Sequence, residues 1–155
     1  MSMKIAVAAD HRGVEYKEKV KQILRDLGHE PVDCGTNSDE SVDYPDFGLK
    51  AARTVAAGEA DYAITVCWTG NGMNMVANKV RGIRAGIALS PDMAFLTRSH
   101  NDANVLTLAQ KYTPVDQLKE IIATFLSTPF EGGRHIPRLE KIRQAEDELQ
   151  DASRR

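Results

Sequence analysis

Cysteine is scarce in this sequence, which contains only Cys34 and Cys67 among 155 residues. Two cysteines are too few for a disulfide framework, and we expect both to be free thiols. Long apolar runs are also missing, since no segment approaches the ~20 apolar residues of a membrane-spanning helix. The N-terminal MSMKIAVAAD has no long apolar run behind a basic stretch, unlike a secretion signal. We therefore expect a cytoplasmic protein with no membrane partner.

Neither sign of charge dominates, because 20 lysines and arginines face 22 acidic residues and the net charge is −2. This balance provides no basic field for nucleic acid, so an anionic ligand would need a local cluster of donors. The histidines are scattered, and the sequence has no His-x-x-x-His or Cys-x-x-Cys pair, no Walker loop and no full dinucleotide fingerprint. We therefore expect no metal, no cofactor and no nucleic-acid partner.

Short apolar runs alternate with helical patterns along the chain, an order typical of an α/β protein with a parallel sheet covered on both faces. The expected strands span residues 4–9, 30–33, 62–67, 85–89 and 105–108. The expected helices span residues 14–27, 46–57, 71–79, 91–98, 114–126 and 137–149. The length suits one domain over residues 1–155, with a charged helical tail at 143–155. The predicted fold is a three-layer αβα sandwich with a five-stranded, Rossmann-like sheet and C-terminal helices.

Ligands of open parallel sheets bind outside the carboxyl ends of the strands. Asp10 and His11 follow the first expected strand, Cys67 to Gly72 follow the third, and Ser90 follows the fourth. Asp10 and His11 suit proton handling or ligand binding, although a helix-capping aspartate beside an exposed histidine explains them as well. The polar residues best suited to chemistry therefore converge on the expected functional edge.

The loop Cys67-Trp68-Thr69-Gly70-Asn71-Gly72 has the composition of an anion-binding turn. Its glycines permit unusual backbone angles, and its amides with the following helix N-terminus could hold a phosphate or an oxyanion. A plain strand-to-helix turn is an equally good reading, because Gly-x-Gly alone is a weak signal. Cys67 opens this loop, where nearby amides favour a thiolate that acts as base or nucleophile. The alternative is an inert buried cysteine, which is the reading we adopt for Cys34.

Two further groups of polar residues lie later in the chain. Ser99 to Asn104 combines His100, Asn101 and Asp102 in an expected loop at the amino end of the fifth strand. That is the wrong edge for its own subunit's site, so His100 would serve a neighbouring subunit in a dimer, or the segment is an ordinary Asx-turn. Arg134 and Arg138 lie one helical turn apart and could clamp a phosphate, or form a solvated basic turn.

Taken together, these residues resemble the family of ribose-5-phosphate isomerase type B, which includes galactose-6-phosphate and allose-6-phosphate isomerases. The resemblance covers residues 4–142 and rests on five ordered motifs. They are AADHRG (8–13), SVDYPDFG (41–48), CWTGNGM with ANKVRGIRA (67–85), SHNDANVL (99–106) and FEGGRHIPR (130–138).

The resemblance implies an αβα sandwich that forms a homodimer with shared active sites, with pairing of dimers into tetramers left open. It assigns Cys67 as the base between C2 and C1, and Asp10 as the group that moves hydroxyl protons. His100, helped by Thr69, would open the sugar ring, and the amides of Trp68, Gly70, Asn71 and Gly72 would hold the enediolate. It also implies a group of residues that bind substrate without a metal: His11, Lys111, Arg134 and Arg138 for phosphate, Asn101 for the sugar, and Tyr44 in the pocket wall.

Two residues depart from the family's usual pattern. Trp68 replaces a usual glycine, which narrows the mouth of the site, and Lys111 replaces an arginine and loses its bidentate fork. Met73 cannot act as the glutamate base of some relatives, so the chain belongs with the cysteine type. The expected activity is interconversion of ribose 5-phosphate and ribulose 5-phosphate. The alternatives are another sugar phosphate, a non-catalytic phosphosugar or nucleotide sensor, and a redox switch that uses both thiols.

Overall fold

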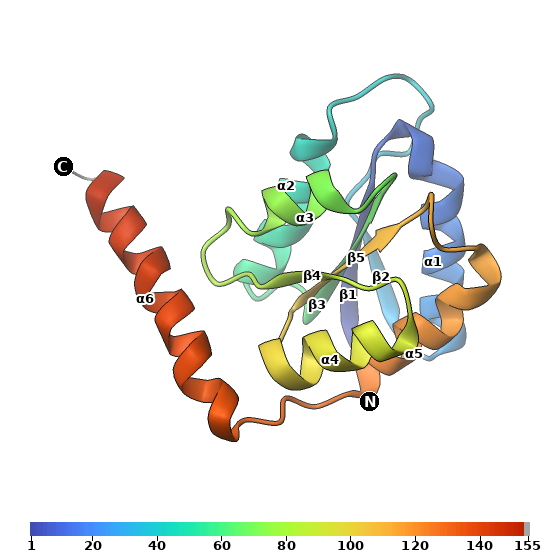
Figure 1. The fold of residues 1–155 in the computed structure, drawn as a ribbon. Helices are drawn as coiled ribbons and strands as arrows, with labels where there is room; N and C mark the ends of the chain where they lie inside the picture. Colours follow the sequence, from blue (N-terminus) through green and yellow to red (C-terminus); the bar gives the residue numbers. More distant parts are fainter. Residues whose placement is uncertain (154–155) are drawn as a thin grey trace.

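The computed structural model describes residues 1–153, so residues 154 and 155 of the expected tail (143–155) lie outside the described residues. Five parallel strands form one sheet in the order β2-β1-β3-β5-β4 (Figure 1). They are β1 (Lys4–Ala9), β2 (Glu30–Asp33), β3 (Tyr62–Cys67), β4 (Ala85–Ile87) and β5 (Val105–Ala109). The predicted α/β fold with a five-stranded parallel sheet is confirmed.

Helices connect successive strands, as the alternating pattern predicts, and two more follow the last strand. They are α1 (Val14–Asp26), α2 (Tyr44–Ala56), α3 (Asn71–Ala77), α4 (Pro91–Asn101), α5 (Leu118–Ser127) and α6 (Ile136–Ser153). Short 3-10 turns η1 (His11–Gly13), η2 (Val115–Gln117) and η3 (Gly133–His135) precede α1, α5 and α6. The expected loop at Ser99 to Asn104 is partly wrong, because α4 continues through Asn101 and ends where Asp102 adopts φ 47°. Aspartate tolerates this left-handed conformation, and its backbone N–H caps the helix by bonding to Arg98 O.

The two faces of the sheet bury side chains of different size. On one face, Ile5, Val7 and other large residues pack against α1, α4 and α5. On the other, mostly alanines pack against α2 and α3. The small side chains let these helices approach closely, and a Cβ added to Gly48 would lie 2.6 Å from a methyl of Val76. The three layers therefore follow from alternation in residue size along the strands.

Both edges of the sheet have features that limit further strand pairing. The side-chain amide of Asn78 bonds both backbone groups of Ala85 in β4, at 2.8 and 3.0 Å. The amide of Asn104, just before β5, bonds Arg84 N and Gly82 O on the inner side, where the chain that enters β4 faces β5. On the opposite edge, β2 contains Pro31, which has no backbone N–H to donate.

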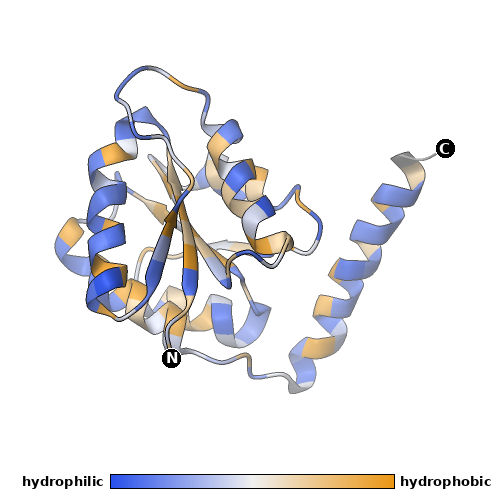
Figure 2. Ribbon diagram, turned by 180° about the vertical axis from the view of Figure 1, so that it is seen from behind, coloured by the Kyte–Doolittle hydropathy of each residue, from blue (hydrophilic) through white to orange (hydrophobic). Residues whose placement is uncertain are grey.

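Helix α6 lies apart from the layers at the end of an extended connection (Figure 1). Polar contacts link it to the body: Arg81 pairs with Asp147 at 2.8 Å, and Glu146 accepts a bond from Gly82 N at 3.1 Å. Figure 2 shows hydrophobic residues spread among hydrophilic ones along this helix, and Ile142 and Leu149 are exposed. Between residues 1 and 153, none of the helices has the length and apolar character required to cross a bilayer.

A buried lysine ties α1 to the carboxyl end of β2. Lys17 is fully buried, and its Nζ lies 2.7 Å from each oxygen of Asp33 and 2.6 Å from Asn37 Oδ1. Lys21 Nζ also lies 2.7 Å from Asp33. Burial raises the pKa of Asp33, but the hydrogen bonds from Lys17 and Lys21 outweigh it and bring the pKa down to about 2. The same carboxylate accepts a bond from Gly35 N and so shapes the loop that leaves β2.

We expect Lys17→Met to lower the free energy of unfolding by about 1–3 kcal/mol, because Asp33 loses its buried, charged donor. The control is Lys19→Met, which removes an exposed lysine of the same helix. Since the folded pKa of Asp33 is depressed, its stabilisation is present above the unfolded pKa of about 4 and is lost as pH falls toward 2. Urea unfolding of both variants should therefore show a deficit for Lys17→Met at pH 7 that shrinks near pH 2. An equal deficit at both pH values would contradict this role of the pair.

Candidate functional site

A cavity of about 690 Å³ opens at the carboxyl edge of the sheet. It lies between the turn after β1, the loop that leads into α2, and the start of the loop after β3. Among its lining residues are Asp10, His11, Tyr44 and Trp68. Four residues from three separate predicted motifs thus share one cavity.

Asp10 and His11 are both held by backbone donors. The Asp10 carboxylate accepts a bond from Arg12 N at 3.1 Å and caps η1. His11 Nδ1 accepts a bond from Val42 N at 3.2 Å, which ties β1 to the loop before α2. Because Nδ1 is an acceptor, a neutral His11 carries its proton on Nε2 and can donate it to a ligand.

Cys67 ends β3 at the same edge. It pairs with Ala109 of β5, and its carbonyl accepts a bond from Gln110 N at 2.9 Å. The Trp68 carbonyl accepts a bond from Lys111 N at 2.9 Å, so the segments that follow β3 and β5 stay paired beyond the ends of the two strands. The Cys67 thiol is free and half-buried, whereas Cys34 is buried and burial raises the pKa of its thiol. Of the two thiols, Cys67 is the accessible one, in agreement with the inert role expected of Cys34.

The loop after Cys67 turns sharply into α3. Gly70 adopts φ 88°, a conformation that favours glycine, and α3 begins at Asn71. Thr69 Oγ1 lies 3.4 Å from Asn71 N. The first amides of a helix have no acceptor within it, so this turn offers donors beside Cys67. Gly72 lies against the Tyr44 ring, where an added Cβ would be 2.5 Å from Cζ.

Four of the other predicted residues lie at the opposite end of the sheet. His100 and Asn101 end α4 just before β5, whereas Lys111 follows the carboxyl end of that strand. The five residues of β5 separate the two ends by roughly 16 Å. Asn101 lines a separate groove of about 570 Å³ beside α6, and Arg134 and Arg138 lie exposed in η3 and α6. One chain therefore does not bring these four residues to Cys67.

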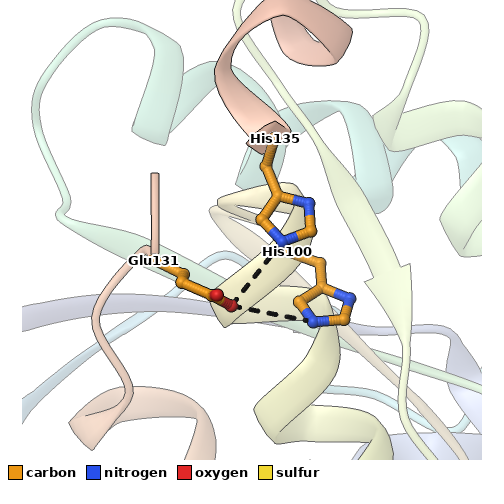
Figure 3. A group of neighbouring side chains, drawn as sticks. All are labelled: His100, Glu131 and His135. Atoms are coloured by element: carbon orange, nitrogen blue, oxygen red, sulfur yellow. Dashed lines mark ion pairs between the residues drawn. The ribbon is translucent and has the colours of Figure 1, made fainter. Parts of the chain in front are cut away.

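His100 has two neighbours that the sequence reasoning missed. Its ring stacks on that of His135 with centroids 4.3 Å apart, and Glu131 lies 3.8 Å from His100 and 3.6 Å from His135 (Figure 3). Burial lowers the pKa of His135, and the neighbouring charges of His100 and Arg134 lower it further. The Glu-x-x-x-His spacing of Glu131 and His135 was the available signal for two of the three residues, but nothing in the pattern linked them to His100.

Comparison with known proteins places these features in a family. The model of the ribose/galactose isomerase family matches residues 5–142. Ribose-5-phosphate isomerase B of Escherichia coli is 41% identical over 90% of this chain and 93% of its own. The chain belongs to the ribose/galactose isomerase family.

Solved structures agree with this assignment. Ribose-5-phosphate isomerase B of Clostridium thermocellum matches with a TM-score of 0.92 and 44% identity, over 95% of this chain and 99% of its own. The enzyme of Mycoplasma genitalium, solved with bound ribulose 5-phosphate, matches with a TM-score of 0.88 and 38% identity, over 94% of this chain and 97% of its own.

Gly72→Ala should displace the Tyr44 ring from the cavity wall. Tyr44 is 40% exposed and has room to move, so we expect the free energy of unfolding to change by less than about 1 kcal/mol. Trp68 is the only tryptophan and lines the same cavity, so its fluorescence should shift toward that of a more hydrated indole.

The control for this experiment is Gly48→Ala, whose Cβ would press on Val76 and Met73 in the buried contact between α2 and α3. It should lower stability by about 1–3 kcal/mol and leave the Trp68 emission of the folded protein unchanged. If Gly72→Ala shows the same Trp68 emission as the wild type, the predicted displacement of the Tyr44 ring by the new methyl group is contradicted.

Proposed function

We propose that this chain interconverts ribose 5-phosphate and ribulose 5-phosphate through ring opening and an enediolate. The observation that carries the proposal is the half-buried, free thiol of Cys67 at the start of a glycine-containing turn that offers backbone donors. Relatives over most of the chain are named ribose-5-phosphate isomerase B, and one structure holds ribulose 5-phosphate.

In the proposed reaction, the Cys67 thiolate removes the proton from C2 of the open-chain aldose and returns it to C1 of the enediolate. The C2 proton is weakly acidic, so the negative charge that develops on oxygen must be stabilised where it forms. The amides from Trp68 to Gly72 supply donors at that point. Asp10, across the same edge of the sheet, transfers the proton between the hydroxyl oxygens.

Ring opening and phosphate binding complete the site. We propose that His100 protonates the ring oxygen with help from Thr69, and that Asn101 contacts the sugar. His11, Lys111, Arg134 and Arg138 bind the phosphate, whose binding energy positions the reacting carbons. Because one chain keeps His100, Asn101, Arg134 and Arg138 away from Cys67, we propose that a second subunit supplies them. The active form is then a homodimer with two shared sites.

Trp68 favours a second substrate class. Its indole is 44% exposed and lines the cavity beside Tyr44, where it can alter the fit of the sugar. Comparison of kcat/KM for ribose 5-phosphate, galactose 6-phosphate and allose 6-phosphate tests both candidates. A preference for ribose 5-phosphate supports the first, and a preference for a hexose phosphate supports the second. Binding without turnover of any sugar in the panel would overturn the proposed isomerase.

Cys67→Ala should lower kcat by about 10²–10⁴-fold or more while largely sparing substrate binding, because the variant loses the base. Ketose formation followed by absorbance gives kcat, and calorimetric titration of the variant gives the affinity. Cys34→Ala is the matched control, since it removes the other thiol, which is buried, and should keep its activity. Equal loss of binding and turnover in folded Cys67→Ala would contradict the role of base.

Shared sites predict that two inactive variants complement each other. A heterodimer of Cys67→Ala and His100→Asn contains one site with both groups intact and one site with neither. After unfolding and refolding of an equal mixture, we expect roughly a quarter of wild-type activity, since half of the dimers are heterodimers. Each variant refolded alone is the control. No recovery in a mixture that contains heterodimers would show that both groups act within one chain.

The chemistry of a thiol base also favours one cellular compartment over others. A base that oxidises to a disulfide or a sulfenic acid loses its function, so Cys67 must stay reduced. We propose that the protein works in the cytoplasm, where thiols are kept in that state.

A further inference from the structure

The cluster of His100, Glu131 and His135 lies away from the cavity at the carboxyl edge. One ligand atom from each residue lies within 4.8 Å of the other two. Figure 3 shows both imidazole rings directed toward the Glu131 carboxylate, with His100 on α4 and His135 on η3. Three potential ligand atoms thus converge from two separate segments of the chain.

The backbone holds this arrangement in place. Glu131 N donates to Ser99 O at 2.9 Å, so the chain at Glu131 is fixed to the residue that precedes His100. His135 N donates to Gly132 O at 3.1 Å, and the His135 side chain is 6% exposed. His135 is therefore rigid, whereas His100 and Glu131 have side chains that are 36% and 55% exposed and can adjust.

The most informative atom in the cluster is Nε2 of His135. It is buried and has no hydrogen-bond partner among the described residues. The nearest Glu131 oxygen, at 3.6 Å, is too far for a good hydrogen bond. A buried nitrogen without a partner costs free energy, so an occupant that accepts its lone pair would stabilise the protein.

We propose that His100, Glu131 and His135 form a binding site for one Zn²⁺ ion. Two nitrogens and one carboxylate are a ligand set that zinc accepts, with bonds of about 2.0–2.2 Å and water in the fourth position. In tetrahedral geometry such bonds place neighbouring ligand atoms roughly 3.3–3.6 Å apart. The 3.6 Å from Glu131 to His135 already fits this spacing, and the 3.8 Å from Glu131 to His100 needs a small rotation. The His100 ring must also tilt out of its stack on His135 so that both lone pairs meet at the ion, and its exposed side chain has room to do so. Imidazole ligands also favour zinc over magnesium or calcium, which prefer oxygen.

Bound zinc has a consequence that rests on the proposed function. The ion takes the lone pair of His100 Nε2, which is the atom that points toward Glu131. A histidine that coordinates zinc through this atom cannot use it to exchange a proton with the sugar ring oxygen. Zinc at this site therefore inhibits ring opening, and a chelator restores it.

Zinc binding is tested on the full-length, untagged protein by titration against a chromophoric chelator, with ZnCl₂ as the probe. We expect one zinc per chain for the wild type. Glu131→Gln and His135→Gln should each weaken binding by more than about tenfold, because each removes a ligand. Glu131→Gln changes an exposed side chain, so it reports on the site even if His135→Gln folds poorly.

Two control variants exclude other ligands. His29→Gln removes a histidine at the start of β2, and Cys67→Ala removes the accessible thiol, so both should bind zinc like the wild type. The proposed zinc site is contradicted if Glu131→Gln and His135→Gln bind zinc as tightly as the wild type, or if Cys67→Ala no longer binds zinc. The titration needs no substrate, so its result holds whether or not the chain isomerises ribose 5-phosphate.

Inhibition is tested separately as the ratio of turnover in zinc to turnover in chelator, measured within each protein. Zinc should lower turnover of the wild type and have a weaker effect on Glu131→Gln at the same concentration. Zinc that binds the wild type without lowering its turnover would overturn the inhibitory role. Failure of the wild type to turn over any sugar phosphate would instead overturn the proposed function.

Discussion

The pairing of β3 with β5 is the constraint on which the carboxyl edge depends. The hydroxyls of Thr65 and Thr107, one on each strand, lie 3.0 Å apart and are fully buried. A shift of register by one residue would turn a strand's side chains to the opposite face and leave one hydroxyl in an apolar environment. The observed register brings Cys67 O to Gln110 N and carries the pairing into both loops. Cys67 owes its position at the carboxyl edge of the sheet to this register, which the buried polar pair favours.

The fold follows from local patterns that the sequence shows plainly. Strands β1, β2 and β3 have the expected bounds, and β1 is the plainest case, because its apolar run is followed directly by Asp10. The end of α4 could not be predicted in the same way, since Ser99 to Asp102 consists of residues that also favour turns. Contacts with the rest of the fold decide this case: Arg98 is buried and its Nε donates to Thr128 O at 3.2 Å, and Ser99 O accepts a bond from Glu131 N at 2.9 Å. Tertiary structure thus extends a helix that local propensity would end earlier.

The candidate site likewise contains some residues that sequence patterns predict and others that only tertiary contacts reveal. Residues at the carboxyl ends of strands, such as Asp10 and Cys67, were placed by the rule for parallel sheets. His135 was not, because its importance comes from stacking on His100, a contact across 35 positions that no periodicity encodes. Helix α6 is a similar case, since its pattern shows apolar residues but not the surface that they face. What sequence reasoning lacks here is the relative placement of segments joined by irregular chain.

The amide of Asn78 bears on how copies of this chain can associate. Its side chain occupies both backbone groups of Ala85 on β4, and Pro31 removes a donor from β2 at the other edge. A sheet with such edges is a poor template for edge-to-edge growth, the route by which exposed strands lead to fibres and aggregates. The amide of Asn78, which satisfies the outer backbone groups of β4, therefore also removes part of the template that another strand would need.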